Sequence, residues 1–248
     1  MANVIYNTPK TEVLRKFKQD IRALLFDVDG TLIDVSMNFP GLDFPASWQV
    51  MEIAAGFDKN EEWQMYFKQW LELSKTPENP KLKEVNQKLN SFWKGKHKNE
   101  VSKYLYPIPF LEGVRFFFDE LKKAKGKWTL GIISSAPDFY VKEIADMFKI
   151  NYFEACEVGL DEQNLLTGEF KSNGLYGKEK SLENFCKKFS IEPEQVAYHG
   201  DSKPDVPVLG CCGLGIAVRP HKKFKQEVMD TSDVVLNLWY IHPLLEIL

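Results

Sequence analysis

The stretch LLFDVDGTLID, Leu24 to Asp34, is the part of the sequence that decides the fold. It starts as a short apolar run and ends in acids, a pattern typical of a parallel strand that is buried on both faces. Asp27 and Asp29 stand one residue apart where this strand is expected to stop. Two carboxylates at that spacing repel each other and lose hydration on burial, so we expect a positive group beside them.

The composition is that of a globular protein with a substantial core. The chain has 248 residues, of which 44% are hydrophobic and 27% charged, with a formal net charge of −3. This balance lacks the basic excess of a nucleic-acid-binding protein, and no apolar run approaches the ~18 residues of a membrane span. The N-terminus lacks the apolar segment of a signal peptide. We therefore expect a cytoplasmic protein, a monomer or homodimer, with no nucleic-acid or membrane partner.

The four cysteines show no spacing typical of a zinc site or a redox pair. We expect the adjacent Cys211 and Cys212 to be small buried hydrophobic residues in a reducing compartment.

Alternating strand and helix patterns predict a doubly wound, parallel α/β sheet. The expected strands lie in RALLFDVD, WTLGIIS, FEACEVG, QVAYHGD, GLGIAV and DVVL, and amphipathic segments separate most of them. The segment LTGEFKSNGLYG has the glycines of a hairpin or a loop. Residues 1–22 are expected to form a helical N-terminal extension, and residues 23–35 and 107–248 a Rossmann-like core.

Residues 36–106 have a different pattern and are expected to form a small helical cap inserted after the first strand. Their segments are helix-patterned, rich in Trp and Phe, and separated by Gly56 and by the turn segment TPENP. We expect the four tryptophans of this insert to pack between helices. The alternative is that one or two of them line a ligand cleft.

Reactive side chains gather where the expected strands stop, which is where doubly wound sheets bind their ligands. The strand ends and one helix start supply eight of them: Asp27, Asp29, Ser134, Ser135, Lys178, Lys180, Asp201 and Asp205. Several carboxylates at one edge require a hard cation, and Mg²⁺ takes oxygen ligands. A hydroxyl and a lysine beside them suit phosphoryl transfer.

The motifs that contain these residues resemble those of the haloacid dehalogenase superfamily. They are DVDGT (27–31), the serine of GIISSAPDFY, the lysine of YGKEKSL and GDSKPD (200–205), in the family's order. The resemblance covers residues 23–35 and 107–236, and the insert falls where members similar to phosphoserine phosphatase carry a helical cap. It implies a Mg²⁺-dependent phosphomonoester hydrolase that acts on a small phosphorylated metabolite through an aspartyl-phosphate.

The resemblance also implies roles for the acidic residues. Asp27 would be the nucleophile, and Asp29 the general acid and then the general base. The metal ligands would be Asp27, Asp29 through its backbone carbonyl, Asp201, and Asp205 through a bound water. A helix-capping role is the alternative for Asp201 or Asp205.

The remaining motif residues would bind the phosphoryl group. Ser134 would hydrogen-bond its oxygens, with Ser135 as the alternative. Lys178 would neutralise charge on the nucleophile and the phosphoryl group, and Lys180 is the weaker candidate because it resembles a solvated surface lysine. Gly30 is assigned to phosphate binding and gives its loop the freedom to leave the strand.

Other hypotheses stay open at this point. A phosphomutase uses the same two aspartates, and a catalytically silent relative would bind a phospholigand without turnover. Ser36 stands where phosphoserine phosphatases carry a glutamate, and no arginine lies between Arg22 and Arg115, so the sequence argues against L-phosphoserine. Asp34 is expected to be a solvated turn acid rather than a substrate contact, and His199 a packed strand residue.

Overall fold

The computed structural model describes residues 4–39, 42, 46–73, 79–124, 126–171, 177–223 and 225–248. The chain divides into two compact units. The core unit comprises Met1–Asp34, Pro109–Cys156 and Ser172–Leu248, and the insert unit comprises Val35–Ile108 and Glu157–Lys171. No helix in these described ranges has both the length and the apolar character needed to cross a membrane.

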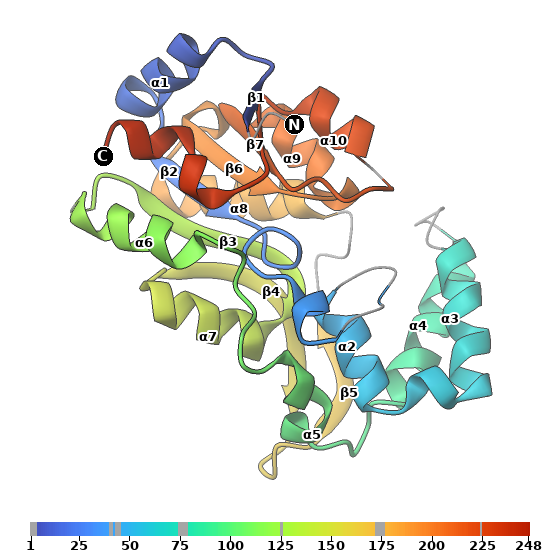
Figure 1. The fold of residues 1–248 in the computed structure, drawn as a ribbon. Helices are drawn as coiled ribbons and strands as arrows, with labels where there is room; N and C mark the ends of the chain where they lie inside the picture. The colour runs from blue at the N-terminus through green and yellow to red at the C-terminus, as the bar shows by residue number, and fades with distance from the viewer. Residues whose placement is uncertain are drawn as a thin grey trace. The chain divides into compact units, whose positions relative to one another are not determined.

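A mostly parallel sheet forms the centre of the core unit (Figure 1). The strand order is β1-β8-β7-β6-β2-β3-β4-β5, in which β1 pairs antiparallel with β8 and the strands from β8 to β4 are parallel. Strands β2, β6 and β7 are buried along their whole length, as strands covered on both faces must be. The predicted doubly wound α/β fold is confirmed. The strands are β1 (Val4–Tyr6), β2 (Ala23–Phe26), β3 (Thr129–Pro137), β4 (Tyr152–Leu160), β5 (Leu166–Lys171), β6 (Val196–Gly200), β7 (Leu214–Val218) and β8 (Val234–Leu236).

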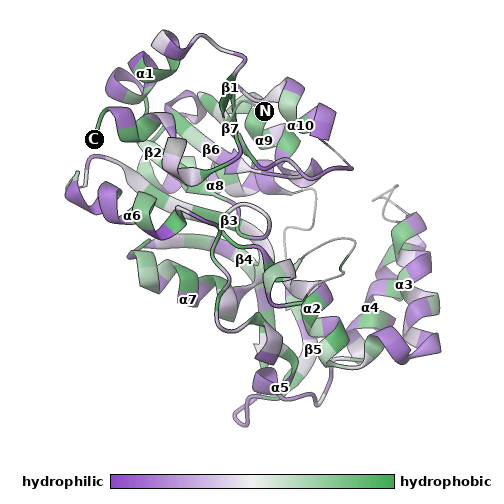
Figure 2. Ribbon diagram, viewed as in Figure 1, coloured by the Kyte–Doolittle hydropathy of each residue, from purple (hydrophilic) through white to green (hydrophobic). Residues whose placement is uncertain are grey.

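Helices cover both faces of this sheet (Figures 1 and 2). Right-handed crossovers place helices on opposite faces when the strand order runs outward from β2 in both directions. Helices α6 and α7 flank β3 in the sequence and lie on one face, whereas α8, α9 and α10 lie on the other. Leu25, Ile133 and Tyr198 pack against α8 and α9 on that second face. The helix bounds are α6 (Val114–Lys123), α7 (Asp138–Phe148), α8 (Lys178–Phe189), α9 (Val206–Cys211) and α10 (Lys225–Thr231).

The first face carries an aromatic core that includes the C-terminal segment. Phe26 of β2 contacts Phe118, whose ring stacks on Phe148 with centroids 4.1 Å apart. Trp239 and His242, from the 3₁₀ helices η6 (Trp239–Ile241) and η7 (Pro243–Glu246) and the turn between them, pack against α6. The end of the chain is therefore part of the core under β2.

The N-terminal extension is only partly helical. Helix α1 (Lys10–Gln19) forms as expected, but Val4–Tyr6 adds β1 to the edge of the sheet and pairs with Val234–Leu236. The strand was not predicted, because a run of three residues is too short to show a period. Its β-branched and aromatic side chains favour a strand once β8 offers an open edge.

The insert unit combines helices with a β-hairpin. Its helices are α2 (Ser47–Ala54), α3 (Glu61–Leu73), α4 (Pro80–Ser91) and α5 (Lys98–Ser102). The end of β4 pairs antiparallel with β5, and Phe170 of β5 contacts the rings of Trp48 and Trp93. The hairpin thus belongs to this unit although it is distant in sequence. The end of the predicted hairpin or loop, residues 172–176, lies outside the described residues.

The pairing register of the core sheet aligns the strand ends that matter for function. Phe26 of β2 pairs with Ile132 of β3 on one side and with His199 of β6 on the other. Gly200 at the end of β6 pairs with Ala217 of β7. The residues that follow these positions therefore leave the sheet along a single edge.

Candidate active site

Five of the predicted site residues are buried polar groups at the carboxyl edge of the core-unit sheet. Each is at most 9% exposed, although charged side chains are rarely buried without partners. The strand ends place four of them and the first turn of α8 places the fifth: Asp27, Ser134, Asp201, Asp205 and Lys178.

Lys178 joins the ends of β2 and β6 by two buried ion pairs. Its Nζ lies 3.0 Å from Oδ1 of Asp27 and 2.6 Å from Oδ1 of Asp205. Burial lowers the pKa of Lys178, but the carboxylates of Asp205 and Asp27 outweigh burial and raise it. The lysine stays cationic and supplies part of the positive charge that these acids require.

Asp205 holds the loop after β6 in place. Its Oδ1 accepts hydrogen bonds from Lys178 and, at 2.7 Å, from the hydroxyl of Tyr198. Its Oδ2 accepts from the backbone N–H of Asp201 and from both the N–H and the hydroxyl of Ser202. Burial raises the pKa of Asp205, but Lys178 and these donors bring it below its ordinary value. Both oxygens of this carboxylate are thus engaged by protein donors.

Asp27 and Asp201 are the acids that the protein leaves short of positive charge. Burial is the main cause that raises the pKa of Asp27 to about 7, with Asp205 adding to the effect and Lys178 opposing it. Burial followed by the Asp205 and Asp27 carboxylates raises the pKa of Asp201 well above its ordinary value. Oδ1 of Asp201 is buried without a hydrogen-bond partner among the described residues.

This acidic cluster has the donor set of a magnesium site. One oxygen from each of Asp27, Asp201 and Asp205 lies within 4.8 Å of the other two. Oxygen-only ligands suit a hard divalent cation, and the unpartnered oxygen of Asp201 is a ready ligand for one. The residues present therefore fit the Mg²⁺ that the motifs predict.

Gly30 allows the motif loop to approach Asp201. The loop after β2 is held by backbone bonds from Leu32 and Ile33 to the carbonyl of Val28, and Gly30 has a left-handed φ of 79°. A Cβ at this position would lie 2.3 Å from Oδ2 of Asp201. Only glycine satisfies both the backbone conformation and the space.

Ser134 and Ser135 lie near the end of the regular part of β3. The register between β3 and β4 shifts after Ile133, so the strand changes course at this point. The hydroxyl of Ser134 accepts a hydrogen bond from the N–H of Ala136 at 3.2 Å, and Ser134 is more buried than Ser135. Its hydroxyl proton remains available to donate to a phosphoryl oxygen.

Other residues singled out in the sequence do not join this cluster. Lys180 pairs with Glu183 on the exposed side of α8. His199 is fully buried in β6, as expected, and bonds to the carbonyl of Leu25 and to His242.

Asp34 and Cys211 differ from expectation. The Asp34 side chain is only 17% exposed and pairs with Arg219, so it is not a freely solvated turn acid. Cys211 is exposed and Cys212 half-buried, because α9 ends at Cys211 and its last turn is not covered as the sheet-facing residues are. The expectation that both cysteines are buried was wrong.

Three residues that support the site were missed in the sequence. Tyr198 bonds to Asp205, Trp239 donates its indole N–H to the carbonyl of Thr31 at 3.0 Å, and His242 bonds to His199. The only sequence signal for Tyr198 was the alternation of side chains between the two faces of the strand VAYHG. The two C-terminal residues carry no local signal because their partners lie far away in the sequence.

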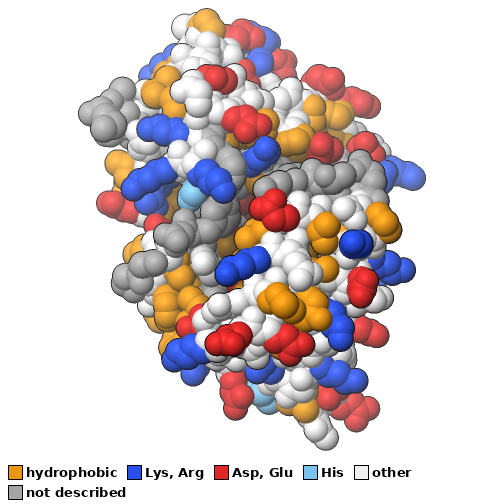
Figure 3. Space-filling model, turned by 90° about the vertical axis from the view of Figure 1, so that its right-hand side faces the viewer, with side chains coloured by type: hydrophobic (Ala, Val, Ile, Leu, Met, Phe, Trp, Pro, Cys, Tyr) orange, Lys and Arg blue, Asp and Glu red, His pale blue; other side chains and the backbone are white. Residues whose placement is uncertain are grey.

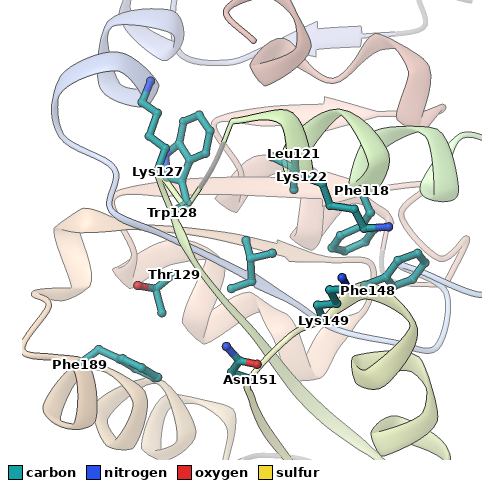
Figure 4. A pocket seen from close by; sticks show the side chains of 12 residues that line it. Phe118, Leu121, Lys122, Lys127, Trp128, Thr129, Phe148, Lys149, Asn151 and Phe189 are labelled. Atoms are coloured by element: carbon teal, nitrogen blue, oxygen red, sulfur yellow. The ribbon is translucent and has the colours of Figure 1, made fainter.

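A cavity of about 400 Å³ lies at the opposite, amino edge of β3 (Figure 4). Phe118 and Phe148 lie on one side of it, and Trp128 and Lys127 lie on another. None of the predicted site residues lines it. The candidate active site is therefore defined by its buried charges and not by this cavity.

Comparisons with known proteins find chains of similar sequence and fold. A phosphoserine phosphatase from Archaeoglobus fulgidus is 24% identical over 229 residues, 90% of this chain, and the chain spans 59% of the length of that relative. Among solved structures, an apo phosphoserine phosphatase matches with a TM-score of 0.65 at 20% identity over 91% of this chain and 98% of its own. Cytosolic 5′-nucleotidase IIIB bound to cytidine matches with a TM-score of 0.63 at 15% identity, over 95% and 89% of the two chains.

The family comparison covers most of the chain. The model of the haloacid dehalogenase-like hydrolases matches residues 24–210, which contain all four motifs and every member of the buried acidic cluster. The two solved structures share its fold. With the site geometry and this match together, the chain belongs to the haloacid dehalogenase-like hydrolase family.

Proposed function

We propose that this protein is a Mg²⁺-dependent phosphomonoester hydrolase that acts on a small phosphate ester through an aspartyl-phosphate on Asp27. The observation that carries the proposal is the pairing of Asp27 with Lys178 beside the uncompensated Asp201. Such a site is short of one positive group and is preorganised to receive a cation and an anion together. Phosphoryl transfer depends mainly on positioning and charge neutralisation of this kind.

The proposed first step uses four side chains of the core unit. An ionised oxygen of Asp27 attacks phosphorus while the bond from phosphorus to the ester oxygen breaks. Asp29 donates the proton that the leaving alkoxide requires. Lys178 and the hydroxyl of Ser134 bind the phosphoryl oxygens, where negative charge must be balanced.

The second step releases phosphate. Asp29, now ionised, takes a proton from water, the water oxygen bonds to phosphorus, and the bond to Asp27 breaks. We propose Asp27, Asp201 and the backbone carbonyl of Asp29 as ligands of Mg²⁺, with Asp205 ordering the loop that carries Asp201. When bound, Mg²⁺ supplies charge neutralisation for the acids and the phosphoryl group.

A raised pKa of Asp27 makes this activity depend on the balance of charge. Because burial raises its pKa, the metal-free carboxyl of Asp27 holds a proton more readily at neutral pH than an ordinary aspartate does. Any added positive charge beside it favours the ionised form. The proposal therefore ties turnover to the cation through the protonation of the nucleophile itself.

The test is hydrolysis of p-nitrophenyl phosphate with and without MgCl₂, for wild type, Asp27→Asn and Asp58→Asn. Asp58 is an exposed acid of the insert unit and serves as the control. We expect activity only with Mg²⁺, its loss in Asp27→Asn, and inhibition by beryllofluoride, which mimics an aspartyl-phosphate. No turnover in the presence of Mg²⁺, or full activity in Asp27→Asn, refutes the proposal.

The substrate arm of the test is a panel of phosphorylated metabolites that includes phosphoserine. Two relatives are called phosphoserine phosphatases and one is a 5′-nucleotidase. This chain has Ser36 where the amino-acid-binding glutamate of phosphoserine phosphatases would stand, and residues 36–106 contain no arginine. We expect phosphoserine to be a poor substrate.

A further inference from the structure

We infer that Arg219 binds a second anionic group of the substrate, so that the preferred substrates are phosphomonoesters that also carry a phosphate or a carboxylate. The inference rests on the proposed hydrolase function and adds the substrate class. It assigns a specificity role to a residue outside the four motifs.

The segment that carries Arg219 lies against the candidate active site within the core unit. Arg219 directly follows β7, which pairs with β6 through Gly200 and Ala217. Two residues later, the N–H of His221 donates to the carbonyl of Asp201 at 2.9 Å. Strand β2, which carries the nucleophile, is the second neighbour of β7, about 10 Å away at the usual spacing of strands. That separation suits two charged groups of one small metabolite.

The backbone of Arg219 is held in a conformation that a long side chain seldom adopts. Its φ is +45°, in the left-handed region that favours glycine. Its N–H donates to the carbonyl of Leu236 at 2.7 Å, which fixes the start of the loop against β8. A strained non-glycine residue next to a reactive site suggests a function for its side chain.

The guanidinium of Arg219 reaches across to the motif loop and keeps most of its donors available. Its Nη1 lies 3.3 Å from Oδ2 of Asp34, the last residue of LLFDVDGTLID. A guanidinium has five N–H donors, and this is the sole contact of the Arg219 side chain that we find in the described part of the chain. The side chain is 45% exposed. Asp34 therefore orients the guanidinium without saturating it.

The charge around Arg219 favours an anion. Lys203, Lys222 and Lys223 are exposed residues of the two loops at this edge of β6 and β7, although the chain as a whole has a net charge of −3. On the side of the molecule shown in Figure 3, Lys and Arg side chains lie at several places on the surface among acidic ones. Arginine binds carboxylate and phosphate through two parallel hydrogen bonds, which gives it more directional specificity than the lysines.

The experiment compares substrates that lack a second charged group with substrates that carry one. Wild type, Arg219→Gln and Arg219→Gly are assayed with p-nitrophenyl phosphate, glycerol 1-phosphate, 3-phosphoglycerate and propane-1,3-diol bisphosphate. We expect KM for the last two to rise tenfold or more in both variants, since a hydrogen bond to a charged group is lost. Turnover of the first two should change less than about twofold, because they make no such bond. Of the two doubly anionic compounds, the one whose KM rises more shows whether carboxylate or phosphate is the preferred second group.

Two controls separate specificity from structure. Arg22 is an exposed arginine that precedes β2 at the amino edge of the sheet. Arg22→Gln should change neither KM nor turnover for any of the four substrates. Arg219→Gly relieves the strain of a left-handed φ at this position, so the melting temperature of the variant should be no lower than that of wild type. The variant should still lose the preference for doubly anionic substrates. Equal losses on all four substrates would assign Arg219 a structural role and overturn the inference.

The failure of this inference is distinct from failure of the proposed function. If wild type hydrolyses p-nitrophenyl phosphate but shows no preference for a second anion, the inference is wrong and the function stands. If wild type hydrolyses none of the four, thermal stabilisation by propane-1,3-diol bisphosphate and by inorganic phosphate gives the answer without turnover. Equal stabilisation of wild type and Arg219→Gln by the bisphosphate overturns the inference.

Discussion

Replacing Asp201 by Asn removes a buried acid that the metal-free core unit does not compensate. Because burial and the Asp205 and Asp27 carboxylates raise its pKa well above 3.8, the folded protein binds a proton that the unfolded chain releases. The contribution of Asp201 to the free energy of unfolding is therefore largest at low pH and falls by up to about 1.4 kcal/mol per pH unit above 3.8, until the folded-state pKa is reached. Asn binds no proton and avoids this loss.

The size of the effect follows from the spacing of the carboxylates. Asp201 has an oxygen within 4.8 Å of an oxygen of each of the other two acids. At that distance and an effective dielectric constant of 20, one like-charge pair costs about 3 kcal/mol. We therefore expect metal-free Asp201→Asn to be about 3 kcal/mol more stable than wild type at pH 8, and about half of that at pH 5.

The assay is urea unfolding followed by tryptophan fluorescence, from pH 5 to pH 8, in EDTA and in MgCl₂. Taking the difference between variant and wild type at each pH cancels the titration of the groups that do not interact with Asp201. Mg²⁺ should stabilise wild type and the Asp58→Asn control but leave Asp201→Asn nearly unchanged. If the difference in free energy of unfolding does not grow with pH, other groups of the protein compensate the charge of Asp201. Equal stabilisation of Asp201→Asn by Mg²⁺ shows that Asp201 is not a ligand.

Three further changes test the supports of the site. Gly30→Ala should abolish turnover and destabilise the protein by more than about 2 kcal/mol in urea unfolding, because its Cβ meets Asp201. Gly56 has the same φ of 79°, but a Cβ there would meet nothing within 4 Å. A similar loss of stability in Gly56→Ala would therefore contradict the steric argument. Trp239→Phe removes the hydrogen bond to the loop carbonyl, so it should lower kcat more than it raises KM, with about 1 kcal/mol lost in stability. Burial lowers the pKa of His199 to about 4 and that of His242 well below 6.5, so wild type loses stability as pH falls below 6.5. His242→Gln should weaken that loss by up to about 1.4 kcal/mol per pH unit in urea unfolding, and an unchanged slope would show that His242 is not a buried neutral group.

The sequence was sufficient to place the polar side chains that directly follow a strand. Asp27 and Asp201 each follow a short apolar strand, and parallel pairing brings such ends to one edge without further information. Lys178 was expected at the same edge because it begins a predicted helix and stands in one of the four motifs. The strands and the site positions were therefore predictable from local patterns and charge balance.

The parts that were not predictable depend on pairing between distant segments. Arg219 and Asp34 are 185 residues apart, and neither residue's neighbours indicate the other. The same holds for β1, whose three residues form a strand because β8 is available, and for the hairpin that joins the insert unit. Local patterns cannot specify such contacts because many segments of similar composition could make them.

The C-terminal segment shows how the site is held rigid by residues that take no part in its chemistry. The N–H of Leu244 donates to Nδ1 of His242, so the proton of that ring must be on Nε2, where it is donated to His199. The Nδ1–H of His199 then donates to the carbonyl of Leu25, two residues before Asp27. Each ring has one donor and one acceptor, so this order is consistent only if both histidines are neutral. Together with the bond from Trp239 to Thr31, it attaches both the strand and the loop of LLFDVDGTLID to the end of the chain. Asp27, the proposed nucleophile, is therefore fixed by pairs of buried polar groups that are satisfied only in this one arrangement.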